Sequence, residues 1–338
     1  MEVTMSVTIK DIAKVAGVSY STVSRALNGI GVVKEDKKNK ILEIAKEMGY
    51  SPNLSAVNLK AQKTNTIGLF FSTFGKITSP FVLHKTLVGI YSVVESDYNI
   101  LVKGIDLQEP NHLNPSNLDG VIIISQREED APFIEEAISK NIPVVVVNRP
   151  VFMEVSNVLT DETEGMKHAM EHLLTNGHRK IGIIEAGLEL ASTRARHRGW
   201  VCAAEEFELR PEHFNVRRGD YSFDSGYLAA KELLRDNITA ILCFNDDMAF
   251  GAKKAIDELG LAVPEDISLI GYDNLDIPRV SEMGLTTVER NMEELAIEGT
   301  KLLLDKIKNG NKENERIYMD TKLILRSSVR DLNESIIK

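Results

Sequence analysis

The chain has 338 residues, which is too long for one small domain and enough for two or three. Hydrophobic residues make up 43% and charged residues 27% of the chain, as in an ordinary soluble protein, and no run of eighteen apolar residues suits a membrane span. The net charge of −10 argues against nucleic-acid binding by the chain as a whole.

The charge is unevenly distributed along the chain. Residues 1–64 contain ten Lys or Arg and six Asp or Glu, a net charge of +4, whereas residues 65–338 contain thirty and forty-four, a net charge of −14. A small basic head on a large acidic body is typical of a DNA-binding domain attached to a part that does not bind DNA. A charge of +4 alone is also compatible with chance.

Residues 7–28 predict two short helices joined by a turn. Thr8 and Asp11 have the spacing of a capping box, which starts the first helix, and Gly17 ends that helix. Ser19 then caps the second helix. Two short helices with a Gly-bearing turn form a helix-turn-helix, in which the first residues of the second helix contact base edges in the major groove of DNA.

The outward face of this second helix is polar, and its members are Tyr20, Ser21, Thr22, Ser24 and Arg25. Hydroxyl groups and a guanidinium suit phosphates and base edges. A helical hairpin from some other core would explain the apolar residues but not this polar face. A third amphipathic helix is predicted over residues 34–48, which completes a three-helix unit.

Residues 53–61 form a short amphipathic segment that is too short to be stable as a helix by itself. From the residues alone, a plain linker is the simplest interpretation.

From residue 67 onward, short apolar runs alternate with amphipathic helical stretches. The runs cover residues 67–71, 99–105, 120–125, 143–148, 180–185, 240–245 and 267–272, and helices are predicted over 161–176, 224–236 and 247–259. Continuous apolar strands separated by helices indicate parallel sheets covered on both faces. The remaining chain is long enough for two such sheets.

One connection departs from this pattern. Residues 107–120 join two predicted strands, contain two prolines and three asparagines, and show no helical periodicity. Because a parallel crossover usually contains a helix, we expect that this connection lacks one.

Motifs for catalysis, metals and cofactors are not evident. The sequence contains no G-x-S-x-G elbow, phosphate-binding loop or H-E-x-x-H pair. His168 and His172 have a metal-compatible spacing but no third ligand, so no metal or cofactor is expected. Cys202 and Cys243 lie in apolar stretches and are expected to be buried, reduced thiols. Since no signal peptide is evident, we expect a cytoplasmic protein.

Polar and aromatic side chains follow several predicted strands, where open α/β sheets bind their ligands. Sugar recognition requires planar polar groups and an aromatic face. Each such residue alone is more often a helix cap or a solvated loop residue, but their shared placement predicts a ligand site. The residues are Asn148, Arg149, Tyr221, Asn245, Asp246 and Asp273.

The stretch T-I-K-D-I-A-x-x-A-G-V-S-x-x-T-V-S-R-x-L-N, from Thr8 to Asn28, resembles the start of the lactose-repressor/galactose-repressor (LacI/GalR) family of bacterial transcription regulators. The match is long and ungapped. Further motifs extend the resemblance over nearly the whole chain: P-N-x-x-A-x-x-L from Pro52, V-x-x-D ending at Asp161, R-x-x-G from Arg196, N-D at Asn245, G-Y-D ending at Asp273 and L-T-T-V from Leu285.

The resemblance implies a fold: an all-α helix-turn-helix head and an α/β, periplasmic-binding-protein-like body of two parallel-sheet subdomains, crossed three times by the chain. It implies a head over residues 1–50, a hinge helix and linker over 51–65, and an effector-binding and dimerisation domain over 66–338. The subdomains would comprise 66–159 with 289–318, and 160–288 with 319–332.

The resemblance also implies DNA contacts. Tyr20, Ser21 and Arg25 would contact bases, while Ser19, Thr22, Ser24 and Asn28 would hold phosphates. The hinge helix would form only on operator DNA, where Leu59 would wedge into the minor groove. Thr8, Asn53, Ala56 and Lys60 complete the implied DNA-binding set.

A third implication is an effector in the cleft between the subdomains. Arg196 becomes the effector-binding arginine, and we expect it to face Asp273 across the cleft, with Asn245 nearby and the Tyr221 ring as the aromatic face. Asn291 stands where the family has a proline, and Met292 follows where the cleft wall is completed. The implied set is Arg149, Arg196, Tyr221, Asn245, Asp246, Asp273 and Met292.

The sequence therefore predicts a dimeric transcriptional repressor that responds to a ligand. The predicted effector is a sugar or sugar derivative. Two alternatives stay open. One is a regulator that is controlled by a protein partner and has a vestigial pocket. The other is a sugar-processing α/β enzyme with an accessory helical domain. The absence of catalytic motifs argues against the enzyme. The tail after Arg330 is too short for a heptad repeat, so we expect a homodimer rather than a tetramer.

Overall fold

A computed structural model describes residues 7–28, 33–50, 64–74, 79–94, 97–108, 113–187, 189–275 and 283–333. The chain divides into two compact units, the head (residues 1–64) and the body (residues 65–338). The predicted hinge residues Asn53, Ala56, Leu59 and Lys60 lie outside the described part of the chain.

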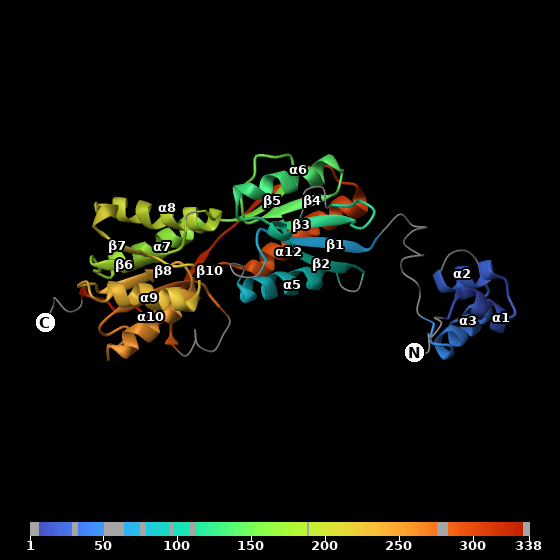
Figure 1. Cartoon of the computed structure of the whole chain (residues 1–338), viewed down its shortest axis with the longest axis horizontal. Helices are drawn as coiled ribbons and strands as arrows, with labels where there is room; N and C mark the ends of the chain where they lie inside the picture. The colour runs from blue at the N-terminus through green and yellow to red at the C-terminus, as the bar shows by residue number, and fades with distance from the viewer. Residues whose placement is uncertain are drawn as a thin grey trace. The chain divides into compact units, whose positions relative to one another are not determined.

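The head contains α1 (Ile9–Ala16), α2 (Tyr20–Asn28) and α3 (Glu35–Glu47), shown in blue in Figure 1. Thr8 and Asp11 form the predicted capping box, with the Thr8 amide donating to Asp11 Oδ2 at 2.9 Å. Gly17 ends α1 with φ of 64°, a conformation that favours glycine. The three helices meet in one small core, which contains Ile12, Ala13, Val23, Ala26, Ile41 and Ala45.

The body contains two lobes, each built on a six-stranded sheet. In the first lobe the order is β11-β5-β4-β3-β1-β2, and all neighbours are parallel. Its strands are β1 (Thr66–Phe71), β2 (Asn99–Gly104), β3 (Gly120–Ile124), β4 (Val144–Val147), β5 (Ser156–Thr160) and β11 (Arg316–Met319). One face packs on α6 (Ala131–Ser139), and the other packs on α5 (Pro80–Val94) and α12 (Met292–Asn309) (Figure 1).

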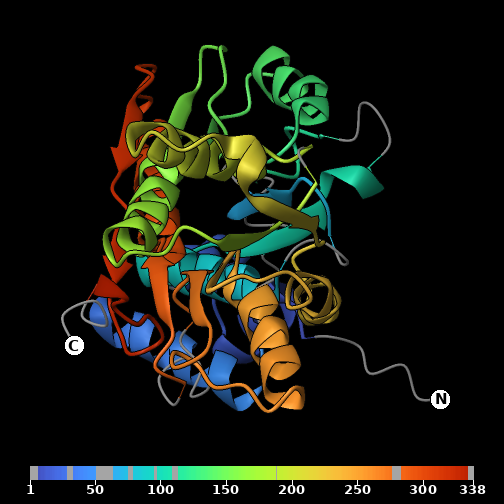
Figure 2. The same cartoon turned by 90° about the vertical axis from the view of Figure 1, so that its left-hand side faces the viewer.

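The sheet of the second lobe has the order β12-β10-β9-β8-β6-β7, with β12 antiparallel to β10. Its strands are β6 (Ile181–Glu185), β7 (Asn215–Arg218), β8 (Ala240–Cys243), β9 (Ser268–Asp273), β10 (Thr286–Glu289) and β12 (Lys322–Ile324). Helices α7 (Glu162–Thr175) and α8 (Ala191–Glu206) cover one face, and α9 (Phe223–Leu233) and α10 (Asp246–Glu258) cover the other (Figures 1 and 2).

The chain passes between the lobes three times, from β5 to α7, from β10 to α12 and from β11 to β12. The described structure thus confirms the predicted fold class, an all-α helix-turn-helix head and an α/β body of two predominantly parallel sheets. Since parallel strands of each lobe end at one edge, the loops that follow them gather where the lobes meet.

The unusual connection between β2 and β3 has one 3₁₀ turn, Ile105–Leu107, and no α-helix in its described residues. Leu113 and Leu118 from this connection are buried in the same core as Phe133 of α6. Two leucines of a largely polar loop therefore pack in a core to which a crossover helix would ordinarily contribute.

Some predictions were incomplete or wrong. The short strands β5, β7, β10, β11 and β12 were not predicted, and β7 and β11 are edge strands whose residues are largely half-buried or exposed. Cys202 is exposed on α8, contrary to prediction, whereas Cys243 is buried within β8. Among the described residues, no helix is long and apolar enough to cross a membrane.

Candidate functional site

The first candidate site is the exposed face of α2. Val23 and Ala26 are buried in the core of the head, so the opposite side of the helix faces outward. Tyr20, Ser21 and Arg25 are exposed on it, and Tyr20 retains 55% of its accessible surface. More than half of the Tyr20 side chain is therefore accessible to a partner.

Ser19 organises the start of this helix. Its hydroxyl accepts the Thr22 amide at 3.2 Å and lies 2.8 Å from the hydroxyls of both Ser21 and Thr22. A cluster of hydroxyls at a helix N-terminus suits a phosphate oxygen. Thr22 and Ser24 are half-buried, Thr8 is exposed at the start of α1, and Asn28 is the last residue of α2.

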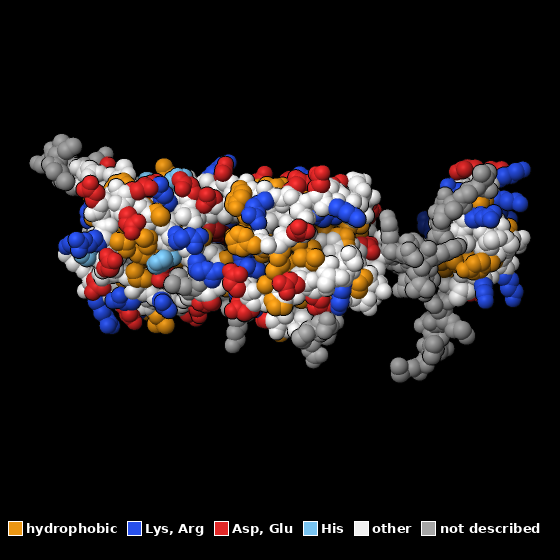
Figure 3. Space-filling model, turned by 90° about the horizontal axis from the view of Figure 1, so that it is seen from above, with side chains coloured by type: hydrophobic (Ala, Val, Ile, Leu, Met, Phe, Trp, Pro, Cys, Tyr) orange, Lys and Arg blue, Asp and Glu red, His pale blue; other side chains and the backbone are white. Residues whose placement is uncertain are grey.

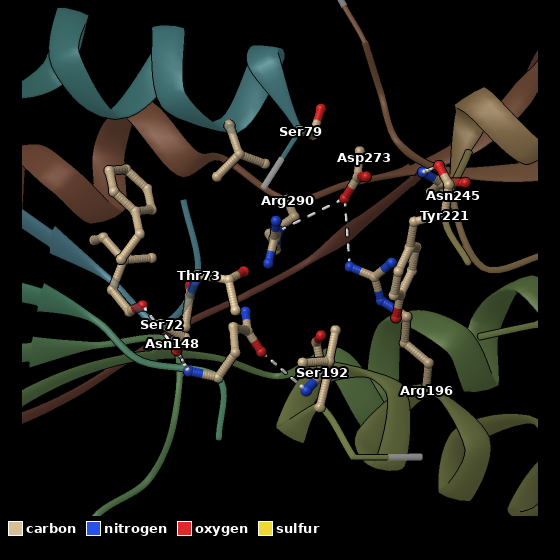
Figure 4. A pocket seen from close by; sticks show the side chains of 15 residues that line it. Ser72, Thr73, Ser79, Asn148, Ser192, Arg196, Tyr221, Asn245, Asp273 and Arg290 are labelled. Atoms are coloured by element: carbon tan, nitrogen blue, oxygen red, sulfur yellow. Dashed lines mark hydrogen bonds and ion pairs between the residues drawn. The ribbon is translucent and has the colours of Figure 1, made fainter. Parts of the chain in front are cut away.

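The second candidate site is a cavity of about 650 Å³, including its open mouth, between the two lobes of the body. We call it the interlobe cavity (Figure 4). The first lobe contributes Phe71, Ser72, Thr73, Ser79, Val82, Ile124, Gln126 and Asn148; the second contributes Leu190, Ser192, Arg196, Tyr221, Asn245 and Asp273; and Arg290 comes from the segment between β10 and α12. Polar and apolar side chains from both lobes thus line one cavity, as is usual for ligand sites.

Four charged side chains are joined at one wall of the interlobe cavity. Arg196 Nε donates to Glu162 Oε2 at 2.7 Å, and Arg196 Nη2 donates to Asp273 Oδ1 at 3.3 Å. Arg290 Nη1 donates to Glu162 Oε1 at 2.9 Å, and its Nε lies 3.7 Å from Asp273 Oδ1. The group has no net charge, and this matters because unpaired charges are very costly to bury.

The pKa values of the two carboxyl groups, Glu162 and Asp273, are shifted in opposite directions. Burial raises the pKa of Glu162, but the Arg196 and Arg290 guanidiniums outweigh it and hold that pKa below its ordinary value. Burial also raises the pKa of Asp273, and there the same guanidiniums offset it only in part. Glu162 is therefore the firmly ionised anchor, and Asp273 is the carboxyl that exchanges a proton more easily.

Arg196 is fixed by more than its ion pairs. It also donates to the Phe244 carbonyl, and its guanidinium lies 3.7 Å from the centre of the Tyr272 ring, a cation–π contact. The Tyr221 ring lies 6.0 Å from the guanidinium, and its hydroxyl is 2.5 Å from that of Thr193. The arginine is therefore held in one orientation before any ligand arrives.

Backbone strain is concentrated at the interlobe cavity. Seven non-glycine residues in the described part of the chain have positive φ, and three of them line this cavity: Asn148 (78°), Tyr221 (70°) and Asp273 (105°). Such conformations cost of order 1–3 kcal/mol each and persist where the surrounding structure enforces them, often at functional sites. They turn these residues into the cavity after their strands end.

The Asn148 amide has both its oxygen and its nitrogen buried without a hydrogen-bond partner in the described structure. Leaving such a group unpaired costs roughly 1–3 kcal/mol, so it marks a place where a ligand would complete the bonding. The Asn245 side chain, in contrast, has both of its polar atoms bonded. Its Nδ2 donates to the Tyr221 carbonyl at 2.9 Å, and its Oδ1 accepts the Met248 amide at 2.9 Å.

Of the predicted effector residues, Arg196, Tyr221, Asn245 and Asp273 line the interlobe cavity. The prediction that Arg196 and Asp273 face each other across the cleft is wrong. Both residues belong to the second lobe and form an ion pair there. Gln126 of the first lobe contacts the second lobe through hydrogen bonds from the Ala191 and Ser192 amides at the start of α8.

Three other predicted residues are not among those that line the interlobe cavity. The buried Asp246 carboxylate accepts the Thr287 hydroxyl at 2.7 Å and the Leu275 amide at 2.8 Å. Met292 is buried in the core of the first lobe. Arg149 turns to Ser125 and Glu128 and lines a neighbouring cavity.

Arg290, which was not among the predicted residues, lines the cavity and pairs with Glu162. A signal for it existed, because Arg290 follows β10 just as Asp273 ends β9, and both occupy strand C-termini. Ser72 and Thr73 carried the same signal because they follow β1, whereas Ser79, which precedes α5, carried none. Among the described residues, no three His, Cys, Asp or Glu side chains gather as metal ligands; His168 instead contacts Glu164 at 3.0 Å.

Two family models match parts of this chain, and named proteins are similar to it over nearly its whole length. The family model described as bacterial regulatory proteins, lacI family, matches residues 8–53, and the model of a periplasmic binding protein-like domain matches residues 170–329. A protein named "Probable HTH-type transcriptional repressor ExuR" from Bacillus subtilis (strain 168) is 40% identical over 96% of this chain and 99% of its own length. The PurR transcriptional repressor of Actinobacillus pleuropneumoniae serotype 3 (strain JL03) is 33% identical over 97% of this chain and 99% of its own.

Two solved structures are similar to this chain over nearly its whole length. The lac repressor dimer bound to operator and the anti-inducer ONPF superimposes with a TM-score of 0.84 at 26% identity, covering 96% of this chain and 100% of that one. The complex of the transcriptional regulator CelR with cellobiose gives a TM-score of 0.70 at 26% identity, covering 95% and 99%.

Proposed function

Because the chain belongs to the LacI family of bacterial regulatory proteins and is a DNA-binding transcriptional repressor, we propose that a sugar or sugar derivative in the interlobe cavity controls its affinity for operator DNA. We further propose that it acts as a homodimer in the cytoplasm. The related repressors are not enzymes, which removes the sugar-processing alternative.

The exposed polar face of α2 supports the DNA-binding part of this proposal. Tyr20, Ser21 and Arg25 project from it and suit base edges, and Arg25 can form a bidentate contact with guanine. The hydroxyl cluster around Ser19 suits phosphate contacts that fix the register of the helix in the major groove. Thr22, Ser24 and Asn28 belong to the proposed phosphate set.

The observation that carries the effector proposal is the buried group of Arg196, Glu162, Asp273 and Arg290 beside the unpaired Asn148 amide. Guanidinium, carboxylate and amide groups each form paired hydrogen bonds, and adjacent ring hydroxyls supply both donors and acceptors. The charged group is neutral as a whole, so it offers many hydrogen bonds without demanding a charged ligand. Tyr221 adds an aromatic side chain for the apolar face of a sugar ring.

The proposed control is a linkage between ligand binding and lobe closure. Gln126 of the first lobe accepts the Ala191 amide at 2.8 Å and, through its side chain, the Ser192 amide at 3.3 Å, both at the start of α8 in the second lobe. A ligand that touches both lobes binds one degree of closure better than another. Only such a difference in affinity changes the population of the DNA-binding state.

The test is titration of sugars, sugar acids and sugar phosphates into the repressor bound to fluorescently labelled operator, with the operator first selected from random DNA. One class of sugar is expected to change operator affinity. An affinity that ignores every sugar but changes with a purified partner protein would favour the alternative in which the protein partner controls DNA binding.

A further inference from the structure

A second cavity of about 930 Å³, including its open mouth, borders the interlobe cavity. We call it the arginine cavity, because Arg149 from the first lobe and Arg194 and Arg198 from α8 of the second lobe line it. It shares only Asn148 and Ser192 with the interlobe cavity. In Figure 3, which looks onto the side of the body where α8 lies, blue and red side chains are adjacent where the two lobes meet.

Arg149 is a buried cation of this cavity with one unpartnered nitrogen. It is only 4% exposed, its Nε donates to Ser125 Oγ at 2.9 Å, and its Nη1 donates to Glu128 Oε2 at 2.7 Å. Its Nη2 is buried without a hydrogen-bond partner in the described structure, as is the hydroxyl of Thr160 in the same lining. Buried donors of this kind are expensive unless something accepts from them.

Glu128 shows where an anionic group fits. Its side chain is 67% exposed, yet its carboxylate bridges Arg149 at 2.7 Å and Arg194 at 3.2 Å, and so joins the two lobes. An exposed glutamate gains little from such a bridge, because its side chain must be ordered and water screens the pair. The buried Arg149 guanidinium needs an anionic partner, but the exposed Glu128 carboxylate can be exchanged for another anion, while Arg194 stays bonded to the Glu189 carbonyl at 3.1 Å.

The remaining groups favour an anion as well. The first turns of α7 and α8, helices of fourteen and sixteen residues, line the cavity with their positive ends. Glu162 lies in the lining, but Arg196 and Arg290 compensate its charge, and Asp161 is engaged as the N-cap of α7. Arg198 is exposed and forms no ion pair with any residue in the described ranges.

We propose that the arginine cavity is a second ligand site, which binds the phosphoryl group of a small phosphorylated metabolite, a sugar phosphate or a nucleoside monophosphate. The phosphoryl group replaces the Glu128 carboxylate between Arg149 and Arg194 and also reaches Arg198, since guanidiniums bind phosphate through paired hydrogen bonds. Phe152 is 99% exposed and Tyr318 is 62% exposed, and both line the cavity, where they offer apolar surface to the ring that carries the phosphate.

This site goes beyond the proposed function and does not depend on a sugar in the interlobe cavity. A ligand held by Arg149 and Arg198 touches both lobes, and the shared wall at Asn148 and Ser192 connects it to the first cavity. Because coupling is reciprocal, occupancy of one cavity would change the affinity of the other.

The experiment is calorimetric titration of the full chain with inorganic phosphate, a hexose 6-phosphate and a nucleoside 5′-monophosphate, each organic phosphate paired with its unphosphorylated parent. We expect a phosphorylated compound to bind at least about tenfold more tightly than its parent, as charge-assisted hydrogen bonds imply. The compound that binds most tightly shows whether the site prefers free phosphate, a sugar phosphate or a nucleotide.

Four variants locate the site. Glu128→Gln is expected to strengthen phosphate binding by about threefold to tenfold, because it removes the competing charge, while Arg198→Ala weakens it by about tenfold and Arg149→Met abolishes it. Arg210→Ala, which removes an exposed arginine of the same lobe outside the cavity, is the matched control and leaves binding unchanged. Thermal unfolding of each variant confirms that it is folded.

Three results would overturn the proposal. The first is that neither phosphorylated compound binds more tightly than its parent. The second is that Glu128→Gln fails to strengthen binding. The third is that Ser79→Trp, which fills the interlobe cavity, abolishes phosphate binding while Arg198→Ala leaves it intact, because the phosphate would then bind in the first cavity.

Discussion

Glu162 and Arg196 form an ion pair at 2.7 Å in which each side chain keeps no more than 6% of its accessible surface. The pair connects the start of α7, just after the first crossing between the lobes, to the first half of α8. Arg290, just before a second crossing, binds the other oxygen of the same carboxylate. One buried carboxylate thus ties a wall of the interlobe cavity to two of the segments that join the lobes.

Replacing Glu162 by Gln is expected to lower the free energy of unfolding by about 3–5 kcal/mol, because two buried arginines lose their shared partner. Urea unfolding of the two proteins measures the loss. The double variant Glu162→Gln/Arg290→Met should recover part of it, since one unpaired charge is removed. A double variant less stable than the single one would show that Arg290 stabilises through packing and not through its charge.

Replacing Asn148 by Gly is expected to leave stability within about 1 kcal/mol of the parent, because glycine tolerates the φ of 78° and the lost amide has no partner. Effector binding in the interlobe cavity should weaken by about 1–3 kcal/mol. Calorimetry with the sugar found in the operator assay measures this, and Asn141→Gly, another asparagine of positive φ, is the control. Equal effector affinity in the two variants would remove Asn148 from the site.

Replacing Arg25 by Ala is expected to relax the preference at one base pair of each operator half-site, with a loss of about 1–3 kcal/mol of discrimination. Binding to a set of operators that differ at single positions measures the change. Lys14→Ala, which removes an exposed charge from α1, should weaken binding to all sequences alike or not at all. If Arg25→Ala also weakens binding to all operator sequences equally, Arg25 contacts a phosphate and not a base.

The stability of the body is expected to fall as pH rises from about 4 to 7. Burial raises the pKa of Asp246 to about 7, although the Thr287 hydroxyl and the Leu275 amide donate to its carboxylate. The ordinary value of that pKa is 3.8, so between these values the folded state binds the extra proton and the unfolded state does not. Stability is therefore fully present below the unfolded pKa and is lost as pH rises through the folded one.

Urea unfolding at pH 5 and pH 8, for the parent and for Asp246→Asn, measures this contribution. The parent should lose about 2–3 kcal/mol more than the variant between the two pH values, because asparagine does not titrate. His172 and His178, whose pKa values burial lowers, are present in both proteins and cancel in the comparison. Parallel losses in the two proteins would show that Asp246 is ionised throughout.

The sequence by itself determined the elements whose signals are local. The capping box of Thr8 and Asp11, the stop at Gly17 and the continuous apolar strands all act within a few residues, so their pattern predicts the structure directly. The same holds for the placement of Tyr221, Asn245 and Asp273 near strand ends. Short edge strands such as β7 and β11 lack a buried face, and their pairing is decided by the neighbour and not by their own residues.

Only the tertiary structure decided which polar residues meet. Glu162 lies 34 residues from Arg196 and 128 residues from Arg290, and no periodicity relates residues so far apart. In the folded chain Arg149 pairs with Glu128, and Met292 is buried in the core of the first lobe. A side chain at a strand end can enter one cavity or its neighbour, and the choice depends on contacts made by the whole fold, since a local pattern fixes the element but not its partners.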